Sequence, residues 1–358
     1  MAKKRSSASV RAIAEKAGLS LGAVSMAMRD DPSIPERTRD RVKAIAAELG
    51  YQRNARVSEL MALLKQQSLR DGQESLALVI PASRTEPGLS HYIETSIKHA
   101  KKRAEERGYG VEVFELAEQG ISSQRLAKII DTRGIRAAIF GPHRNVTGAI
   151  DIDTKKLATV AIGYSVVEPP MHRVVIDHYR NIHLAMAQLI ARGYERIGLM
   201  LEPQTDARAR DLITAGYWDV SRRLPRTQRF EPFVNEPDEK PISQWMKRKK
   251  PDAVIGYGDV WYQRLTQQGP LDPETLGYVF LDHFNQPGIK AAGVPYLNGM
   301  LTEVAVDQLV AALQVNEFGV PAFARTTAVP CAWQEGDTVR ALQTEVREPL
   351  FMVPTADE

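Results

Sequence analysis

The sequence predicts an α/β protein with a small helical head and a larger body of parallel sheets in two lobes. Three observations lead to this prediction. Residues 1–70 carry 14 lysines and arginines against 7 aspartates and glutamates, and they contain three short helical patterns. From residue 75 onward, apolar strand-like runs alternate with helical patterns, which is typical of a doubly wound parallel sheet. The alternation begins again after residue 177, which indicates a second lobe of the same style.

The composition is that of a globular protein with more than one folding unit. The chain has 358 residues, of which 43% are hydrophobic, and this length suits two or three units. The single cysteine, Cys331, cannot form an internal disulfide or a cysteine-rich zinc site. No run reaches the roughly 18 apolar residues of a membrane span, and no apolar stretch follows the basic N-terminus as in a secretory signal. We therefore expect a cytoplasmic protein without a metal or a cofactor.

The charge is unevenly distributed, because residues 1–70 have a formal balance of +7 and the rest of the chain has −4. This asymmetry suggests a polyanion partner for the head alone, although a solvated basic arm would carry the same charge. The pattern of the head favours three helices around one small core, over residues 10–17, 21–28 and 34–49. Their expected caps and end points are Ser9, Gly18, Ser20, the capping box at 33–36 around Pro35, and Gly50.

The tight, glycine-containing turn between the first two helices is typical of a helix-turn-helix pair. In that arrangement the second helix enters the DNA major groove with its N-terminal residues against the base edges. A three-helix module for protein contacts would show the same caps and apolar stripe, so spacing leaves both interpretations open. The residues that would face the groove are Leu21, Gly22, Ser25, Met26 and Arg29.

The head contains a dense signature of short motifs. They are Ile13-Ala14, Ala17-Gly18-Leu19-Ser20, Val24-Ser25, Thr38-Arg39, Val42, Ala47-Glu48-Leu49-Gly50-Tyr51 and Asn54. With this signature the head resembles the N-terminal domain of the LacI/GalR family of bacterial transcriptional regulators. The resemblance implies phosphate contacts and packing against the DNA backbone at Ser20, Thr38, Tyr51 and Asn54, and Ser9 completes the expected DNA-binding set. It also implies that Leu21 and Gly22 read bases and that Met26 stands where many members have arginine. Because these three side chains cannot hydrogen-bond to bases, discrimination would depend on thymine methyls, Ser25, Arg29 and DNA shape.

Residues 54–61 resemble the hinge helix of the family, which folds beside its dimer mate on the operator. The resemblance makes Leu60 the leucine that is wedged into the minor groove. The alternative is an ordinary linker helix in which Leu60 packs. The connector that follows, residues 62–74, is longer than the family leads us to expect.

The body is expected to span residues 75–350, with a tail at 351–358. Its N-lobe would cover about 75–177 plus a later return segment, and its C-lobe about 178–296. The resemblance extends here to an effector domain similar to periplasmic sugar-binding proteins, through Gly193-Tyr194-Glu195-Arg196-Ile197-Gly198-Leu199, Gly216-Tyr217 and 305–309. The expected strands are 76–80, 111–116, 137–140, 158–162, 174–176, 197–201, 253–256, 277–281 and 326–330. The expected helices are 89–107, 122–132, 181–192, 207–224, 262–268 and 300–318.

Ligands of such folds lie between the lobes, at the carboxyl ends of the strands. The resemblance implies that Asp259 binds sugar hydroxyls, although it could instead cap the following helix. It places His91 and Tyr92 in the wall of the pocket, and their alternative is packing at a helix start. The full expected set is His91, Tyr92, Tyr164, Tyr257, Asp259, His283 and Asn298.

One position departs from the sugar-responsive members, in which an arginine three residues before a Gly-aromatic pair holds the ligand. Alignment on Gly216-Tyr217 puts Ile213 there, and isoleucine cannot pair with an anion. We therefore expect a neutral effector, or none, unless the alignment slips by a helical turn and Arg208 or Arg210 takes this place.

Enzymatic motifs are missing from the sequence. There is no P-loop, no Gly-x-Ser-x-Gly and no His-Glu-x-x-His, and Gly256-Tyr257-Gly258 lacks the third glycine of a dinucleotide loop. We expect a homodimeric, non-enzymatic transcriptional repressor that binds a pseudo-palindromic double-stranded operator and responds to a small molecule such as a neutral sugar. The alternative is a small-molecule-binding or enzymatic α/β protein whose head mediates protein contacts.

Overall fold

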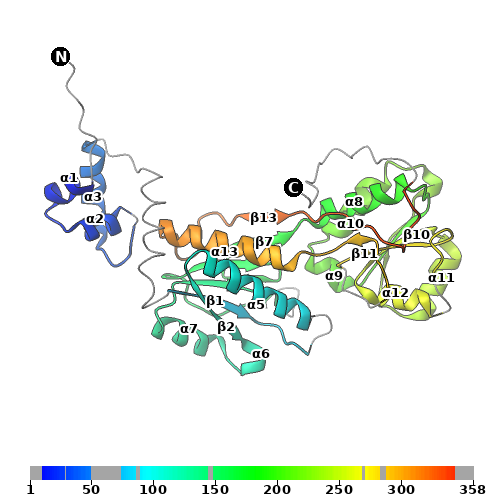
Figure 1. The fold of residues 1–358 in the computed structure, drawn as a ribbon, viewed down its shortest axis with the longest axis horizontal. Coiled ribbons are helices and arrows are strands. Elements are labelled where there is room, and N and C mark those ends of the chain that lie inside the picture. The colour runs from blue at the N-terminus through cyan, green and yellow to red at the C-terminus, as the bar shows by residue number, and fades with distance from the viewer. Residues whose placement is uncertain are drawn as a thin grey trace, which may run out of the picture.

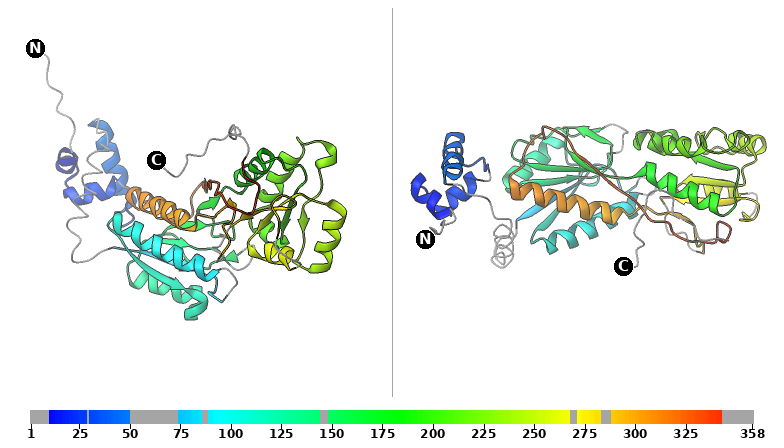
Figure 2. Two further views of the ribbon diagram at one scale, coloured as in Figure 1. Left: turned by 45° about the vertical axis from the view of Figure 1, so that its right-hand side comes forward. Right: turned by 90° about the horizontal axis from the view of Figure 1, so that it is seen from above.

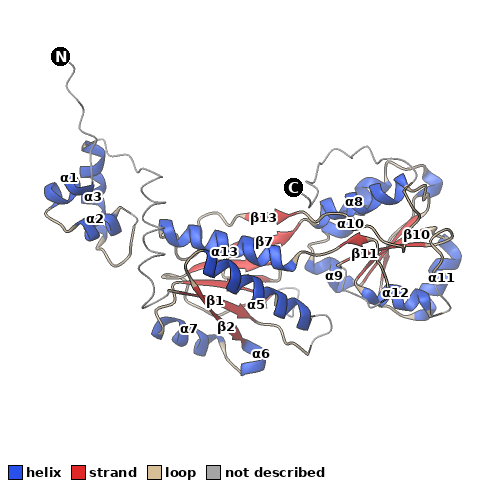
Figure 3. Cartoon of the chain, in the orientation of Figure 1, coloured by secondary structure: helices blue, strands red, loops and turns tan. Residues whose placement is uncertain are grey.

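The computed structural model of the chain describes residues 10–28, 30–49, 74–85, 89–143, 148–267, 271–282 and 288–342. A helical head lies beside the end of the body at which α13 finishes, and the body consists of two lobes side by side (Figures 1 and 2). Each lobe is a sheet between helices (Figure 3). None of the helices in these described parts has the length and apolarity that crossing a membrane would require.

The head has the three expected helices, α1 (Val10–Ala17), α2 (Leu21–Ala27) and α3 (Glu36–Glu48). Gly18 adopts the predicted left-handed conformation, with φ +65°. The predicted capping box is wrong, because Ser33 donates its hydroxyl hydrogen to the carboxylate of Asp31 at 2.6 Å and α3 begins after Pro35 without a side-chain cap. The core of the head consists of Ile13, Ala14, Ala17, Val24, Ala27, Val42 and Ala46.

The N-lobe is built on a six-stranded parallel sheet. Its strands, in spatial order, are β13 (Thr326–Val329), β7 (His172–Ile176), β5 (Ala158–Ile162), β3 (Ala137–Phe140), β1 (Ser75–Ile80) and β2 (Gly110–Glu115). One face is covered by α5 (Leu89–Glu106) and α13 (Asn298–Val315), the other by α6 (Leu116–Gln119) and α7 (Ser123–Thr132). A small parallel pair, β4 (Gly148–Ala149) and β6 (Val166–Glu168), lies outside this sheet.

The C-lobe repeats this arrangement with five strands. They are, in spatial order, β12 (Gly293–Val294), β11 (Gly277–Leu281), β10 (Ala253–Tyr257), β8 (Ile197–Leu201) and β9 (Phe233–Val234). The helices are α8 (His178–Ala191), α9 (Pro203–Arg208) and α10 (Leu212–Ser221) on one side and α11 (Glu239–Lys249) and α12 (Asp259–Thr266) on the other, with a 3₁₀ turn at Arg226–Gln228.

The chain passes between the lobes three times. It crosses from β7 into α8, returns from β12 into α13, and crosses again after β13. The last segment is bound to the C-lobe, because the N–H of Tyr278 donates to the carbonyl of Thr338 at 2.7 Å. The carboxyl ends of both parallel sheets consequently lie near these crossings, where ligands of such folds bind.

The predicted long helix over residues 207–224 is wrong. The structure has two helices, α9 and α10, separated by a turn in which Arg210 and Asp211 adopt left-handed backbone conformations with φ +58° and +59°. The carboxylate of Asp206 accepts a hydrogen bond from the Thr214 hydroxyl at 2.6 Å. The backbone N–H of Thr214 also donates to this carboxylate at 3.3 Å, so Asp206 in α9 satisfies an N–H of the first turn of α10 and stabilises the break.

Candidate nucleic-acid interface and effector cavity

The N-terminal half of α2 forms an exposed edge of the head. Leu21 is 53% exposed and Gly22 is exposed as well, whereas Val24 on the opposite side is buried in the core. Ser20 fixes the start of the helix, because its Oγ accepts a hydrogen bond from the N–H of Ala23 at 3.1 Å. A helix presented in this way can place its first turn against the bases of a major groove.

The neighbouring side chains are less exposed to solvent than the sequence suggests. Ser25 and Met26 are half-buried, and the Sδ of Met26 lies 4.0 Å from the hydroxyl of Ser33. Thr38, in the first turn of α3, is half-buried too. The surface around α2 therefore offers apolar contact more than hydrogen bonds, as the sequence of this helix predicts.

Several cations of the head are already paired within it. Lys16 forms an ion pair with Glu48 at 2.5 Å, and Lys43 forms one with Asp30, which follows α2. Arg37 differs, because it is exposed and has no hydrogen bond or ion pair with a described residue. It directly precedes Thr38, so its place beside an expected phosphate contact was a signal that the sequence analysis missed.

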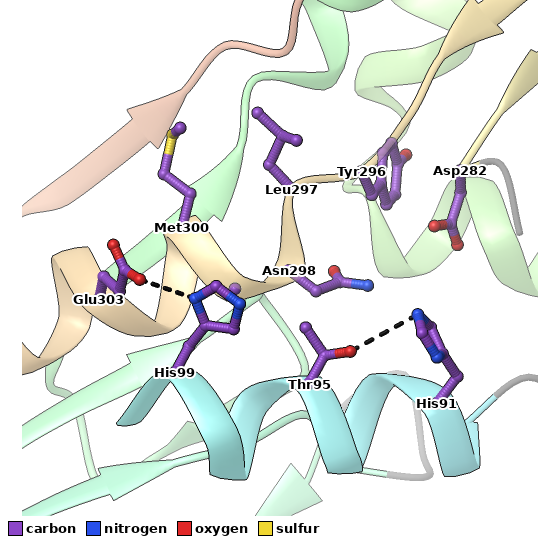
Figure 4. A pocket seen from close by; sticks show the side chains of 10 residues that line it. His91, Thr95, His99, Asp282, Tyr296, Leu297, Asn298, Met300 and Glu303 are labelled. Atoms are coloured by element: carbon purple, nitrogen blue, oxygen red, sulfur yellow. Dashed lines mark hydrogen bonds and ion pairs between the residues drawn. The ribbon is translucent and has the colours of Figure 1, made fainter. Parts of the chain in front are cut away.

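A cavity of about 350 Å³ lies where the first turns of α5 meet the start of α13 and the end of β11 (Figure 4). Nδ1 of His99 is 2.6 Å from a carboxylate oxygen of Glu303, and Nε2 of His91 is 3.5 Å from the hydroxyl of Thr95. Because Asp282 comes from the C-lobe and α5 from the N-lobe, the wall joins the lobes. The lining residues are His91, Thr95, His99, Asp282, Tyr296, Leu297, Asn298, Gly299, Met300 and Glu303.

Asp282 is a carboxylic acid of altered acidity in this cavity. Burial raises the pKa of its carboxyl to about 7, although a hydrogen bond with the Tyr257 hydroxyl opposes part of the shift. Next to it, the Tyr296 hydroxyl lies 2.8 Å from Nδ1 of His178, and burial lowers the pKa of this imidazole to about 4. Near neutral pH the imidazole is uncharged and the carboxyl is divided between its two forms. The cavity can thus present either a donor or an acceptor at Asp282, which suits a ligand rich in hydroxyls.

Residues 9–54 match the family model "Bacterial regulatory proteins, lacI family". The chain carries a lacI-family head. Among curated proteins, the lactose operon repressor of Escherichia coli (strain K12) is 26% identical over 208 residues, which are 57% of this chain and 54% of the repressor. The chain therefore spans about half the length of this relative.

Solved structures resemble the whole arrangement of lacI-family head and body. A Lac repressor dimer bound to operator and the anti-inducer ONPF has a TM-score of 0.53 at 17% identity, covering 94% of this chain and 100% of that one. The transcriptional regulator CelR in complex with cellobiose gives 0.52 at 17% identity, covering 92% and 99%. A putative LacI-family regulator from Rhizobium etli gives 0.57 at 15% identity, covering 75% and 99%. At these identities the likeness establishes the fold: a helix-turn-helix head followed by a two-lobed body similar to periplasmic binding proteins.

The structure brings together some of the residues predicted to bind an effector. His91 and Asn298 line the cavity, and the ring of Tyr257 lies 5.6 Å from that of Tyr296, edge to face. Tyr92 instead packs against the core of the N-lobe, which is the alternative considered for it. The predictions for Ser9, Arg29, Tyr51, Asn54, Leu60 and His283 lie outside the described residues.

Asp259 does not cap α12, because Gly258 occupies the cap position and Asp259 begins the helix. One of its carboxylate oxygens is buried and has no hydrogen-bond partner among the described residues. Its charge contributes to the raised pKa of both Tyr278 and Asp282, but Asp259 is not among the residues that line the cavity. Binding of sugar hydroxyls by Asp259 stays a prediction.

Ile213 is fully buried in the core that α10 shares with the C-lobe sheet. Its side chain lies in this core and offers no hydrogen-bond donor. Ile213 and Gly216-Tyr217 all lie in α10, so the break at 209–211 leaves their alignment intact and separates only Arg208 and Arg210 from it. A neutral effector stays a prediction.

Five residues of the cavity that can hydrogen-bond were not predicted from the sequence, namely Thr95, His99, Asp282, Tyr296 and Glu303. For Asp282 a signal existed, because it directly follows the predicted strand 277–281 and thus lies at a carboxyl end of the sheet. The others depend on how α5 and α13 pack together, which no local pattern shows.

Proposed function

We propose that the protein is a sequence-specific DNA-binding transcriptional regulator, a homodimeric repressor whose operator affinity is set by a sugar or a related metabolite. The observation that carries this proposal is the lacI-family match over residues 9–54, on a head whose recognition helix α2 exposes its first turn. Solved relatives with the same fold include a Lac repressor dimer on its operator and a regulator holding cellobiose.

The parts of the chain take distinct roles in this proposal. Residues 1–61 bind DNA, residues 75–350 bind the effector and dimerise, and no reaction is catalysed. The DNA contacts come from the first turn of α2 together with Thr38 and Arg37. The effector binds in the cavity that contains His91, Asp282 and Asn298. Such a protein acts in the cytoplasm, where its operator is.

Regulation follows from the position of the cavity. Because its wall includes residues of both lobes, a ligand there binds one relative placement of the lobes better than another. The head adjoins the N-lobe end opposite the C-lobe (Figure 1), so a change in lobe placement within a dimer alters the spacing of the two heads.

Selection from a random double-stranded DNA pool tests the proposal. A dimer should enrich a pseudo-palindrome whose half-sites are about 34 Å apart, so that two recognition helices enter successive major grooves. The affinity should fall steeply with salt, because phosphate contacts release counterions. Arg37→Gln should reduce the slope of log K against log salt, while Lys16→Gln, whose cation is paired with Glu48, should change it less. Enrichment of asymmetric sites only, or a flat salt dependence, would contradict the proposal.

Leu60→Gly tests the hinge that the resemblance implies. If Leu60 is wedged into the minor groove, the variant should lose specific affinity but keep dimerisation and weak non-specific binding. Gel shifts with operator and with random DNA, and sedimentation for the dimer, measure these quantities. A lowered melting temperature with an unchanged ratio of specific to non-specific binding would show that Leu60 only packs.

A further inference from the structure

A second cavity, of about 320 Å³, lies in the C-lobe between α11 and α12, which cover the same face of its sheet (Figure 1). α11 leads into β10 and α12 into β11, so both helices end at the amino-terminal edge of the parallel strands. This cavity shares no lining residue with the one between the lobes. Four apolar residues, two basic residues, a serine and a glutamine line it. It is called the α11–α12 cavity below.

The floor of the α11–α12 cavity is apolar. Ile242 is buried in the core of this part of the C-lobe, and Met246, Leu265 and Leu276 are half-buried and pack against the same core. The surface that they turn to the cavity is open to water, so an apolar group that displaces this water is stabilised. The flexible thioether of Met246 can adapt to the shape of such a group. A volume of this size suits one small organic molecule.

Two cations stand at the rim of the cavity. Lys247 and Arg264 are exposed, and neither forms a hydrogen bond or an ion pair with a residue that the structure describes. Ser243 and Gln267 add a hydroxyl and an amide beside them. The rim therefore offers charged and neutral hydrogen-bond donors next to an apolar surface.

Both cations belong to the last turn of their helix, where a basic side chain can stabilise the carbonyl end. Other groups already bond to these ends. The guanidinium of Arg196 donates to the carbonyl of Lys250, directly after α11, at 2.8 Å. In α12 the hydroxyl of Thr266 donates to the carbonyl of Tyr262 at 2.9 Å. The two cations at the rim are therefore not needed to satisfy the helix ends.

The acidic residues of the loop that leads into β11 are engaged elsewhere. The carboxylate of Asp272 accepts a hydrogen bond from the N–H of Glu274 at 3.0 Å. The carboxylate of Glu274 lies 3.7 Å from the guanidinium of Arg340. None of the residues that line the cavity is acidic. The described part of the chain thus supplies no anion for the two cations, and a ligand that carries its own carboxylate is attracted there.

We propose that the α11–α12 cavity binds an amphiphilic carboxylate, a small molecule with an apolar chain or ring and one anionic head. The apolar part lies against Met246 and Leu265, and the head accepts hydrogen bonds from Lys247 and Arg264. This site goes beyond the proposed function, because it is separate from the effector cavity and gives the protein a second class of ligand. Since the ligand contacts both helices of the folded protein, its binding stabilises the fold.

A series of sodium carboxylates, added to the full chain, tests the chemistry of the site. Calorimetry and thermal unfolding compare butanoate, hexanoate and octanoate with 1-octanol, at an ionic strength matched with sodium chloride. The affinity should rise about two- to fourfold with each added methylene, because each one is buried on the apolar floor. 1-Octanol has the same chain as octanoate but no charge for the two cations, so it should bind about fivefold more weakly or worse.

Matched variants locate the site. Lys247→Gln and Arg264→Gln each remove one charge at an exposed position, and each should weaken octanoate binding by about fivefold or more. Arg248→Gln is the control, because Arg248 is exposed in the same turn of α11 as Lys247 but does not line the cavity. The control should bind octanoate as the wild type does.

Three results would overturn the inference: the affinity does not increase with chain length, 1-octanol binds as tightly as octanoate, or both cavity variants bind octanoate as Arg248→Gln does. If a second copy of the chain covers the cavity instead, octanoate does not bind and Arg264→Gln weakens self-association in sedimentation. That result also contradicts the inference. None of these measurements involves DNA, so their failure leaves the proposed function to be judged by operator selection alone.

Discussion

Ile13→Ala should unfold the head and abolish operator binding while the body remains folded. Ile13 is completely buried, and four of the other six residues of the core of the head are alanines, so its side chain supplies a large part of the apolar contact. Truncation of a buried isoleucine to alanine costs about 2 to 4 kcal/mol, and so small a domain has roughly 3 to 5 kcal/mol of stability in total. Most of the folded population of the head would be lost.

Two measurements on the full chain check this result. Gel shift with the selected operator should show no complex for Ile13→Ala, and thermal unfolding should retain the transition of the body. Ile45→Ala is the matched control, because Ile45 on α3 is only partly buried and its truncation removes the same atoms from a looser site. The control should keep most of the operator affinity. Unchanged operator binding by Ile13→Ala would mean that this core does not hold the recognition helix.

The strands of the body could be predicted closely because their sequence signal is strong. β8 and β11 begin and end at the predicted residues, and β1 differs by one. Each is a continuous apolar run, as expected for a parallel strand that is covered by helices on both faces. In the head, Ser20 and Gly18 gave similarly local signals, and the structure places both at the predicted helix boundaries.

The helix boundaries that the sequence did not predict depend on tertiary contacts. No glycine or proline marks the break between α9 and α10, since it depends on the carboxylate of Asp206 reaching Thr214 eight residues later. α11 was overlooked because its sequence is highly charged and contains Pro241. Proline is tolerated in a first helical turn, and Ile242 and Trp245 show the spacing of a buried helical face.

The residues of the candidate cavity also depend on tertiary contacts that the sequence does not show. Asp259 and Asp282 both follow buried strands, so position along the chain could not rank one above the other. Packing separates them, because Asp282 lines the cavity whereas Asp259 does not. His99 and Glu303 are 204 residues apart and meet only because α5 packs along α13.

Asp282→Asn should make the protein more stable at pH 8 and leave its stability near pH 4 almost unchanged. Burial raises the pKa of Asp282 to about 7, against about 4 for an aspartate in an unfolded chain. Between these values the folded protein holds a proton that the unfolded chain has released. The free energy of unfolding therefore falls as the pH rises from about 4 to 7, because the folded protein binds more protons than the unfolded chain in this range. Above about pH 7 the contribution of Asp282 no longer changes with pH. Asparagine does not titrate, so the variant does not undergo this decrease in the free energy of unfolding. The decrease amounts to at most about 4 kcal/mol for a pKa difference of three units.

Urea unfolding of wild type and variant at pH 4.5, 6 and 8 measures the difference. Other titrating groups are common to both proteins and cancel, so the stability of Asp282→Asn relative to wild type should increase from the lowest pH to the highest. Asparagine also tolerates the positive φ of +57° at this position, which keeps backbone strain out of the comparison. Asp151→Asn, at an exposed aspartate of the N-lobe, should show no comparable trend. A difference that stays constant across the three pH values would mean that Asp282 is ionised in the folded protein throughout, and that its cavity presents a fixed negative charge to the effector.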